Sequence, residues 1–298
     1  MLALKKQVPS RIVVLALSIT LPLLAVGCSD TVAKPGGEPP GTSPQPWLPV
    51  SGVGAGDDQL QPSPEETLAQ KGVELSVPSL LGRVEDERES LEVRFLSALV
   101  LAKTGDESAV AALIDLLQDQ EADLRYAAVV GLGGLGSAEA IPSLKASMAD
   151  PSERVRLAAV GALANLGGDE AARALSEKVT DTDEPSDDVR ANAAFSLGDM
   201  RVSVAKPWLI DALDDRGLEV RTAAAVALAD LGDSRAIPVL IETLKNPGAR
   251  DWLVVKAIEG LRGLTGLDFG YPKPYWAPAT EDERAEALRR WIDWWENQ

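Results

Sequence analysis

The sequence predicts an all-α protein, an α-solenoid of stacked helix pairs, from two observations. The 31 residues from Arg216 to Asn246 carry two runs of apolar residues at three- and four-residue spacing, one before and one after Gly232. This pattern is typical of two short antiparallel helices joined at a glycine. One such unit is too short to enclose a core, so it needs neighbours on both sides. The pattern does recur, at spacings of 31, 31, 34, 31 and 33 residues, with equivalent apolar positions at Val93, Leu124, Val155, Val189, Val220 and Leu253.

Columns of identical residues run through these units. One leucine lies eight residues beyond the register position, another lies twenty beyond it, and an arginine follows it directly in five units: Arg94, Arg125, Arg156, Arg190 and Arg221. The columns resemble the HEAT-repeat family, in particular the short bacterial form known as PBS-lyase HEAT-like repeats. The resemblance covers roughly residues 63–266 and implies an α-solenoid, as the repeat spacing itself does.

The repeat array is predicted over residues 63–266, as about five full helix pairs with a degenerate unit at each end. Ser63 caps the first helix, Pro64 occupies its first position, and two acids follow in the first turn. The last unit departs from the pattern because Val254 replaces the arginine. The units begin at about residues 63, 88, 119, 150, 186, 216 and 247.

Residues 267–298 are predicted to form an aromatic loop and a final helix that caps the array. Thr280 and Glu283 have the spacing of a capping box for this helix. Trp291 flanks the face that we expect to seal the array, whereas Trp294 falls outside it and is a candidate for contact with a partner. The sealing face is predicted to contain Ala285, Leu288, Ile292 and Trp295.

A polar residue closes the second helix of each full unit. An arginine near a helix N-terminus opposes the helix dipole, so the arginine column needs a local acceptor. The resemblance to HEAT repeats implies that matching aspartates and arginines form a hydrogen-bonded ladder between adjacent units. A ligand-binding role for these columns is the alternative. The closing residues are Asp119, Asp150, Asp181, Asp215 and Asn246.

The first 27 residues have the pattern of a signal peptide. Three basic residues precede an apolar run from Ile12 to Leu24, which is too short to span a bilayer because spanning takes about 20 apolar residues. Residues 25–28 (Ala-Val-Gly-Cys) resemble the lipobox of bacterial lipoproteins, which implies acylation of Cys28. We therefore expect an extracytoplasmic protein, lipid-anchored to the cell envelope, in the periplasm or at the outer membrane of a bacterium. Ala25 replaces the usual leucine, so the alternative is an ordinary cleavage site and a secreted soluble protein.

Residues 28–62 are predicted to be a flexible linker, because proline and glycine make up about a third of them. Cleavage before Cys28 removes three positive charges and no negative one, which takes the formal net charge from −17 to −20. Such acidity disfavours nucleic acid and charge-driven adhesion to anionic lipid, and it favours a basic partner. We expect membrane contact only through the lipid anchor. Acidity that merely keeps the array soluble is the alternative.

The chain contains no histidine, so Ser-His-Asp catalysis, Cys-His catalysis and histidine-bearing metal sites are excluded. Deoxyhypusine hydroxylases share the repeat form but hold a di-iron centre with His-Glu motifs, which are missing here. Phycobilin lyases share it too, but an exported lipoprotein has no evident access to their substrates. We expect no enzyme activity and no cofactor. Whether calcium binds the acidic loop at residues 181–188 stays open, because clustered carboxylates are suitable ligands but other features of an EF-hand loop are missing.

Two functions remain: a scaffold that binds a protein or peptide, and a structural spacer or accessory subunit of an envelope complex without its own ligand groove. The resemblance implies that the second helices line the concave side of the array, so recognition is expected at their exposed positions. We call these candidate positions the acidic ridge, which would attract a basic segment of a partner. The acidic ridge comprises Asp115, Gln118, Glu177, Asp211, Asp214, Glu242 and Thr243.

Overall fold

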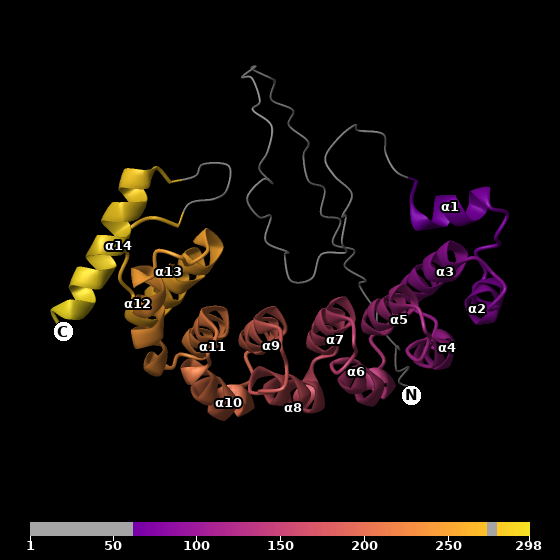
Figure 1. Cartoon of the computed structure of the whole chain (residues 1–298), viewed down its shortest axis with the longest axis horizontal. Helices are drawn as coiled ribbons and strands as arrows, with labels where there is room; N and C mark the ends of the chain where they lie inside the picture. The colour runs from indigo at the N-terminus through magenta and orange to yellow at the C-terminus, as the bar shows by residue number, and fades with distance from the viewer. Residues whose placement is uncertain (1–61, 273–278) are drawn as a thin grey trace, which may run out of the picture. The chain divides into compact units, whose positions relative to one another are not determined.

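The computed structural model describes residues 62–272 and 279–298 (Figure 1). The predicted signal peptide, the predicted lipidation site Cys28 and all but the last residue of the predicted linker lie outside the described residues. The described ranges contain fourteen α-helices and four short 3-10 helices, and no β-strand occurs in them. The prediction of an all-α solenoid is therefore confirmed.

The helices alternate along the chain between two layers (Figure 1). The first-helix layer consists of α1 (Pro64–Gln70), α3 (Leu91–Thr104), α5 (Ala122–Leu135), α7 (Glu153–Leu166), α9 (Asp187–Asp199), α11 (Leu218–Asp230) and α13 (Asp251–Thr265). The second-helix layer consists of α2 (Val77–Glu85), α4 (Ala109–Leu116), α6 (Ile141–Ser147), α8 (Gly168–Val179), α10 (Lys206–Asp211) and α12 (Ile237–Lys245). The 3-10 helices η1 (Ala138–Ala140), η2 (Ser203–Ala205) and η4 (Ser234–Ala236) lead into second helices, and η3 (Ala212–Asp214) follows α10.

Within the first-helix layer, each helix packs on the next, as α3 does on α5 and α9 on α11. Taken by itself, this array curves so that the first helices lie on its inner side and α6, α8 and α10 lie on its outer side (Figure 1). The expectation that the second helices line the concave side is therefore wrong. Apolar periodicity assigns residues to helix faces, but it does not encode the direction in which stacked pairs bend.

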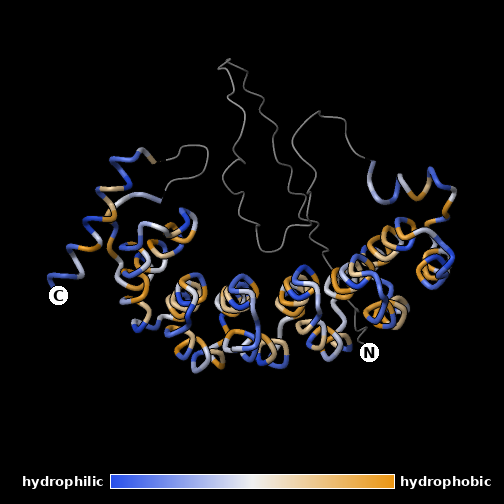
Figure 2. The backbone as a smooth tube through the Cα atoms, viewed as in Figure 1, coloured by the Kyte–Doolittle hydropathy of each residue, from blue (hydrophilic) through white to orange (hydrophobic). Residues whose placement is uncertain are grey.

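The core lies between the two layers and is built from the two leucine columns. Colouring by hydropathy shows apolar and polar positions alternating around each helix of the array (Figure 2), as expected for amphipathic helices. Removing these side chains from water supplies the main favourable term for stacking the pairs. Every member of the two columns has a fully buried side chain: Leu101, Leu132, Leu163, Leu197, Leu228, Leu261, Leu113, Leu144, Leu175, Leu209 and Leu240.

A residue with positive φ follows the first helix of each full unit and turns the chain towards the second helix. Glycine accepts this left-handed conformation without a steric penalty. The fourth unit is the exception, because Arg201 takes the position with φ +52°. The glycines at this turn, with φ between +68° and +72°, are Gly105, Gly136, Gly167, Gly232 and Gly266.

Two glycines inside first helices allow neighbouring helices to approach closely. A Cβ atom added at Gly133 in α5 would lie 2.7 Å from the Cβ atom of Ala162 in α7. A Cβ atom at Gly198 in α9 would lie 2.8 Å from the Cα atom of Ala227 in α11. Real Cβ atoms do not approach so closely, so the helix spacing at these two steps depends on glycine.

The final helix α14 (Glu281–Glu296) starts at a capping box formed by Thr280 and Glu283, and it packs against α12. Its sealing face matches the predicted one only in part, because Leu288 and Trp295 pack against the core as expected but other members differ. Ala285 is exposed, whereas Ala287 and Trp291 are buried, and Trp291 is the largest fully buried side chain in the described chain. None of the described helices is both long and apolar enough to cross a membrane.

Candidate functional site

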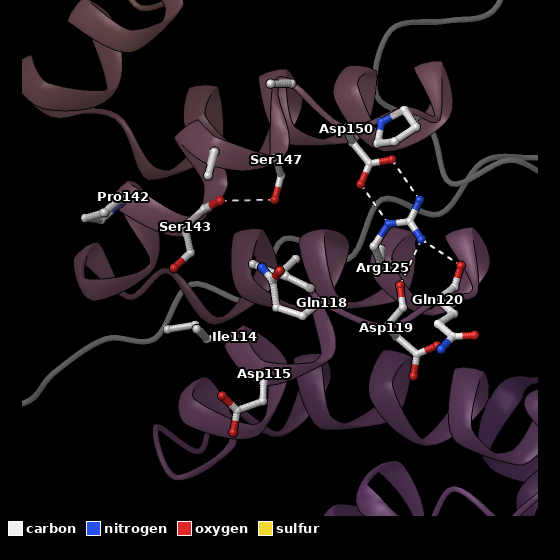
Figure 3. A pocket seen from close by; sticks show the side chains of 14 residues that line it. Ile114, Asp115, Gln118, Asp119, Gln120, Arg125, Pro142, Ser143, Ser147 and Asp150 are labelled. Carbon is white, nitrogen blue, oxygen red and sulfur yellow. Dashed lines mark hydrogen bonds and ion pairs between the residues drawn. The ribbon is translucent and has the colours of Figure 1, made fainter.

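The arginine column links successive units through their loops. In one representative pair, Arg125 donates from Nε and Nη2 to the two carboxylate oxygens of Asp150, at 2.7 and 2.9 Å (Figure 3). Its Nη1 donates to the backbone carbonyls of Asp119 and Gln120, both at 2.9 Å. Each such arginine therefore joins the end of the preceding unit to the end of its own. The structure forms three pairs of this predicted kind: Arg94 with Asp119, Arg125 with Asp150, and Arg190 with Asp215.

Asp150 also accepts a hydrogen bond from the backbone amide of Ser152, at 2.8 Å, which holds the loop in a tight turn. Burial raises the pKa of the Asp150 carboxyl, but the hydrogen bonds from Arg125 and Ser152 lower it by more, so the pKa lies below its usual range. The Asp150 carboxyl is thus ionised at neutral pH. The carboxylates of Asp119 and Asp215 likewise accept hydrogen bonds from an arginine and from a loop amide, so these side chains are not free to receive a partner.

The third pair contradicts the sequence prediction, because Arg156 binds Glu184 and not Asp181. Arg156 donates from Nε and Nη2 to the Glu184 carboxylate at 2.9 Å, and Glu184 also accepts from the amide of Ser186 at 3.0 Å. Asp181 instead accepts from Lys178 at 2.6 Å. The reason is the three-residue insertion in this loop. Glu184 stands six residues before Arg190, the same spacing as between each other ladder aspartate and the next arginine.

The fifth pair also differs. Arg221 binds Glu242, with 2.7 Å between Nη2 and Oε1, because the closing residue of this unit is an asparagine. Asn246 accepts from the backbone amide of Gly248 at 2.8 Å and completes only the turn. The spacing of six residues between acid and arginine could have identified Glu184, but nothing in the sequence pattern singles out Glu242 as a partner of Arg221.

The structure reduces the acidic ridge to four available side chains. Thr243 is fully buried, and its hydroxyl lies 2.7 Å from that of Thr222, so its assignment as an exposed contact residue is wrong. Glu177 pairs with Lys145 at 2.7 Å, and Glu242 pairs with Arg221. The remaining side chains are exposed and form no ion pair or side-chain hydrogen bond within the described residues: Asp115, Gln118, Asp211 and Asp214.

Two of these four side chains line a groove of about 910 Å³ between α4 and α6. Asp115 and Gln118 belong to the α4 wall, together with Ile114 (Figure 3). Pro142 and Ser143 belong to the facing α6 wall, and the Arg125–Asp150 pair lies at one end. The groove thus combines apolar contact surface with a carboxylate and an amide that no other described side chain pairs with.

Ala146 on α6 distinguishes this wall of the groove from the equivalent surface of the other full units. Ser143 precedes the buried leucine of α6, at the position that Trp208 occupies in α10 and Val239 in α12. Ala146, two residues beyond that leucine, replaces the acid that the other full units carry there. The sequence pattern alone did not lead us to this wall. The signal that could have identified it is Ala146, because the other four full units carry an acid at this repeat position.

Trp294 is not the free side chain that the helical pattern predicted. It is half-buried, packs against the core, and its ring centroid lies 5.8 Å from that of Trp291. Trp291 in turn makes an edge contact with Phe269, at 4.7 Å between centroids. The aromatic cluster therefore seals the end of the array, and we do not assign Trp294 to partner binding.

Four of the five carboxylates of the acidic loop at residues 181–188 are paired with basic side chains, and the fifth, Asp183, is exposed. Asp181 and Glu184 bind Lys178 and Arg156 respectively, as described above. Asp187 binds Arg190 at 2.6 Å, and Asp188 lies 3.3 Å from Arg250. Among the residues that the structure describes, no group of three or more histidine, cysteine, aspartate or glutamate side chains is arranged to hold a metal ion.

Comparison with known protein families identifies the repeats. A family model described as HEAT repeats matches residues 110–186 and 180–262, which together span half of the chain. The chain belongs to the HEAT-repeat family. A model for the PBS lyase HEAT-like repeat also matches this HEAT-repeat protein, at residues 93–119. No curated protein matches its sequence.

Several solved structures resemble this HEAT-repeat protein, each at 20% sequence identity. A designed armadillo repeat protein in complex with the peptide (KR)4 gives a TM-score of 0.46, with 64% of this chain and all of that chain covered. The phycocyanin lyase complex from Nostoc sp. PCC7120 gives 0.39, with 83% and 99% covered. Human deoxyhypusine hydroxylase gives 0.29, with 67% and 100% covered.

Proposed function

We propose that this HEAT-repeat protein is a non-catalytic scaffold of the bacterial cell envelope that binds a basic segment of a protein or peptide. The observation that carries the proposal is the groove between α4 and α6. It is lined by Asp115, whose carboxylate is exposed and has no basic partner within the described residues. Asp119 and Asp150, which also line the groove, are committed to the arginine ladder, whereas the Asp115 carboxylate is available.

The lining of the groove suits a long basic side chain. The aliphatic stem of an arginine or lysine fits against Ile114, Pro142 and Ala146, and its charged end reaches the carboxylate of Asp115 and the amide oxygen of Gln118. Attraction between an acidic scaffold and a basic segment raises the association rate and weakens as salt screens exposed charges. A partner of this kind is therefore expected to bind less tightly at high ionic strength.

Anchoring to the envelope is the second part of the proposal, and it is supported by the signal-peptide pattern and the lipobox-like residues 25–28. Substitution Cys28→Ala should leave the exported protein unlipidated and soluble. Fractionation and mass spectrometry of the N-terminus check this expectation. Wild-type protein that is wholly soluble and carries no acyl group would refute the anchor without touching the binding proposal.

A structural spacer is the second candidate function, and one observation favours it. Glu177 and Glu242 are paired with Lys145 and Arg221, so part of the acidic ridge already has basic partners within the array. A spacer needs no groove and would bind basic and acidic peptides equally poorly. The two functions therefore differ in a measurable affinity.

The test uses the full-length protein and a fluorescently labelled peptide that contains one arginine pair, with a peptide containing one glutamate pair as the negative control. Asp115→Ser should weaken binding of the arginine peptide about 2- to 10-fold. Glu177→Ser is the matched control, because it changes the net charge equally at an acid that is already paired. Ser143→Trp should fill the groove and weaken binding of the arginine peptide. The array should tolerate this substitution, because α10 carries a tryptophan at the equivalent repeat position. Equal binding of both peptides, or equal effects of Asp115→Ser and Glu177→Ser, would refute the proposal and favour the spacer.

A further inference from the structure

Trp208 in α10 is a large aromatic side chain that has no aromatic or polar partner in the part of the chain that the structure describes. The other four tryptophans in the described ranges each contact another ring: Trp252 lies 5.8 Å from Phe195, and Trp291, Trp294 and Trp295 form a connected cluster. Within the described residues, Trp208 makes no such ring contact, no cation–π contact and no side-chain hydrogen bond. Its side chain is partly exposed to solvent.

Core packing does not account for a tryptophan at this position. The equivalent residues of the other full units, each directly before the buried leucine of the second helix, are Ala112, Ser143, Ala174 and Val239. Small or medium side chains therefore suffice there to complete the array. An indole that remains partly in water at this position retains unburied apolar surface, and tryptophan is enriched among the residues that dominate binding interfaces.

The surface around Trp208 is mixed apolar and acidic. Val204, just before α10, has a side chain that is 50% exposed, the most exposed large apolar residue in the described ranges, and Pro207 is exposed as well. Asp211 lies three residues beyond Trp208, so both side chains project from the same side of this helix. Asp211 and Asp214 are exposed and have no ion-pair partner within the described residues.

This combination fits a cation. The face of an indole attracts an arginine guanidinium or a lysine ammonium group through its ring quadrupole, and a neighbouring carboxylate strengthens that attraction. The protein already uses this contact internally, since the guanidinium of Arg154 lies 3.9 Å from the ring centroid of Tyr126. Trp208 presents an aromatic ring that no cation of residues 62–272 or 279–298 contacts, next to an acid that none of these residues pairs with.

We propose that Trp208 and Asp211 form a second contact for the basic partner, in which an arginine or lysine side chain stacks on the indole and its charge faces the carboxylate. This inference rests on the proposed function of the groove between α4 and α6. Three helix steps separate α4 from α10 in the second-helix layer. At about 8–10 Å for each step, the two contacts lie roughly 24–30 Å apart, which an extended chain spans in about 7–9 residues.

The partner segment is therefore expected to carry two basic positions separated by about eight residues, one for each contact. Joining two weak contacts in one chain raises the overall affinity because the second contact becomes intramolecular. A peptide whose two basic positions are too close together to reach from α4 to α10 does not gain this affinity. The spacing of the basic positions in the partner thus becomes a measurable property.

The experiment measures fluorescence anisotropy of the full-length protein with two labelled peptides. Each peptide has an arginine pair at both ends, separated by seven or by two glycine and serine residues. The longer peptide should bind more tightly to wild-type protein. Trp208→Ala should weaken its binding by about 2- to 30-fold and abolish its advantage over the shorter one. Val239→Ala in α12 is the matched control and should change neither affinity.

Trp208→Phe and Asp211→Asn keep the test decisive if Trp208→Ala does not fold, because both preserve most of the packing. The phenylalanine variant should retain part of the affinity, and the asparagine variant should lose part of it. Unchanged binding of the longer peptide in the Trp208 and Asp211 variants would overturn the second contact while leaving the groove intact, provided that Asp115→Ser still weakens binding. Failure of wild-type protein to bind either peptide would overturn both proposals together.

Discussion

Replacing Glu184 tests the part of the ladder that the sequence pattern missed. The Glu184 side chain is 1% exposed, and its carboxylate receives hydrogen bonds from Arg156 and from the amide of Ser186. Lys178 lies 3.4 Å away and is itself almost buried. Glu184→Ala therefore removes the main partner of a buried guanidinium and leaves a space in the loop.

The expected cost follows from these contacts. Breaking a buried ion pair by removing one member costs about 3–5 kcal/mol, because the remaining charge is left without compensation. Arg156 keeps its hydrogen bonds to the carbonyls of Asp150 and Pro151, and Lys178 keeps Asp181, so we expect the lower end, about 3 kcal/mol. For an array of this size, the midpoint of thermal unfolding should fall by about 6–12 °C.

Asp181→Ala is the matched control, because the repeat pattern in the sequence predicts Asp181, and not Glu184, as the ladder acid of this unit. Its side chain is 32% exposed, forms an ion pair with Lys178 and accepts a hydrogen bond from the amide of Asp183, so its removal should cost about 1 kcal/mol. Far-UV circular dichroism during heating measures both variants. If Asp181→Ala lowers the midpoint as much as Glu184→Ala, the assignment of Glu184 to the ladder is wrong.

Three further predictions concern pH and backbone conformation. The pKa values of Glu184 and Asp150 lie below the ordinary range in the folded protein. The stability that these residues contribute is therefore complete above the unfolded-state pKa of about 4, and it is lost as the pH falls through their folded-state pKa values. Melting temperatures should therefore drop below about pH 4, and a Glu184→Gln variant whose acid sensitivity equals that of wild type would contradict this. Arg201→Gly should raise the free energy of unfolding in urea by up to about 1 kcal/mol, because glycine adopts the positive φ of this position without a steric penalty. A lower free energy of unfolding would show that Arg201 is not strained. Gly133→Ala should destabilise the protein by about 1–3 kcal/mol, because the added methyl group would collide with α7. Gly161→Ala is the control and should not destabilise it, because the added methyl group meets open space. Equal unfolding midpoints for the two variants would show that α5 and α7 can move apart without loss of stability.

The repeat architecture was predictable because it depends on residues that recur. Each of the five full units places leucine at the same two positions and an arginine beside the register residue, and all eleven leucines of the two columns are fully buried. Residues that recur at one position of every unit indicate that this position has the same environment in each unit, and this inference needs no information about contacts between units. The fold class and the helix pairs therefore followed from periodicity and spacing.

The errors concern contacts between elements that the periodicity of one helix does not describe. Trp294 lies outside the apolar face of its own helix, but α14 meets α12 and the loop of Phe269 at an angle that buries Trp291 and engages Trp294. Thr243 occupies a polar position on α12, yet it faces Thr222 of α11. Trp208 was overlooked for the opposite reason, because a single aromatic residue within a repeat is easily taken for core.

The position of Glu184 also shows where this chain can lengthen without disturbing its fold. The ladder acid keeps its distance of six residues to the following arginine, so the three additional residues are taken up between the end of α8 and Glu184. Growth of the loop on that side leaves the contact between neighbouring units unchanged, and the entropic penalty of a longer loop rises only slowly. The segment at residues 181–183 is consequently a grafting site, at which an epitope or a protease recognition sequence can be carried while the units on either side keep their register.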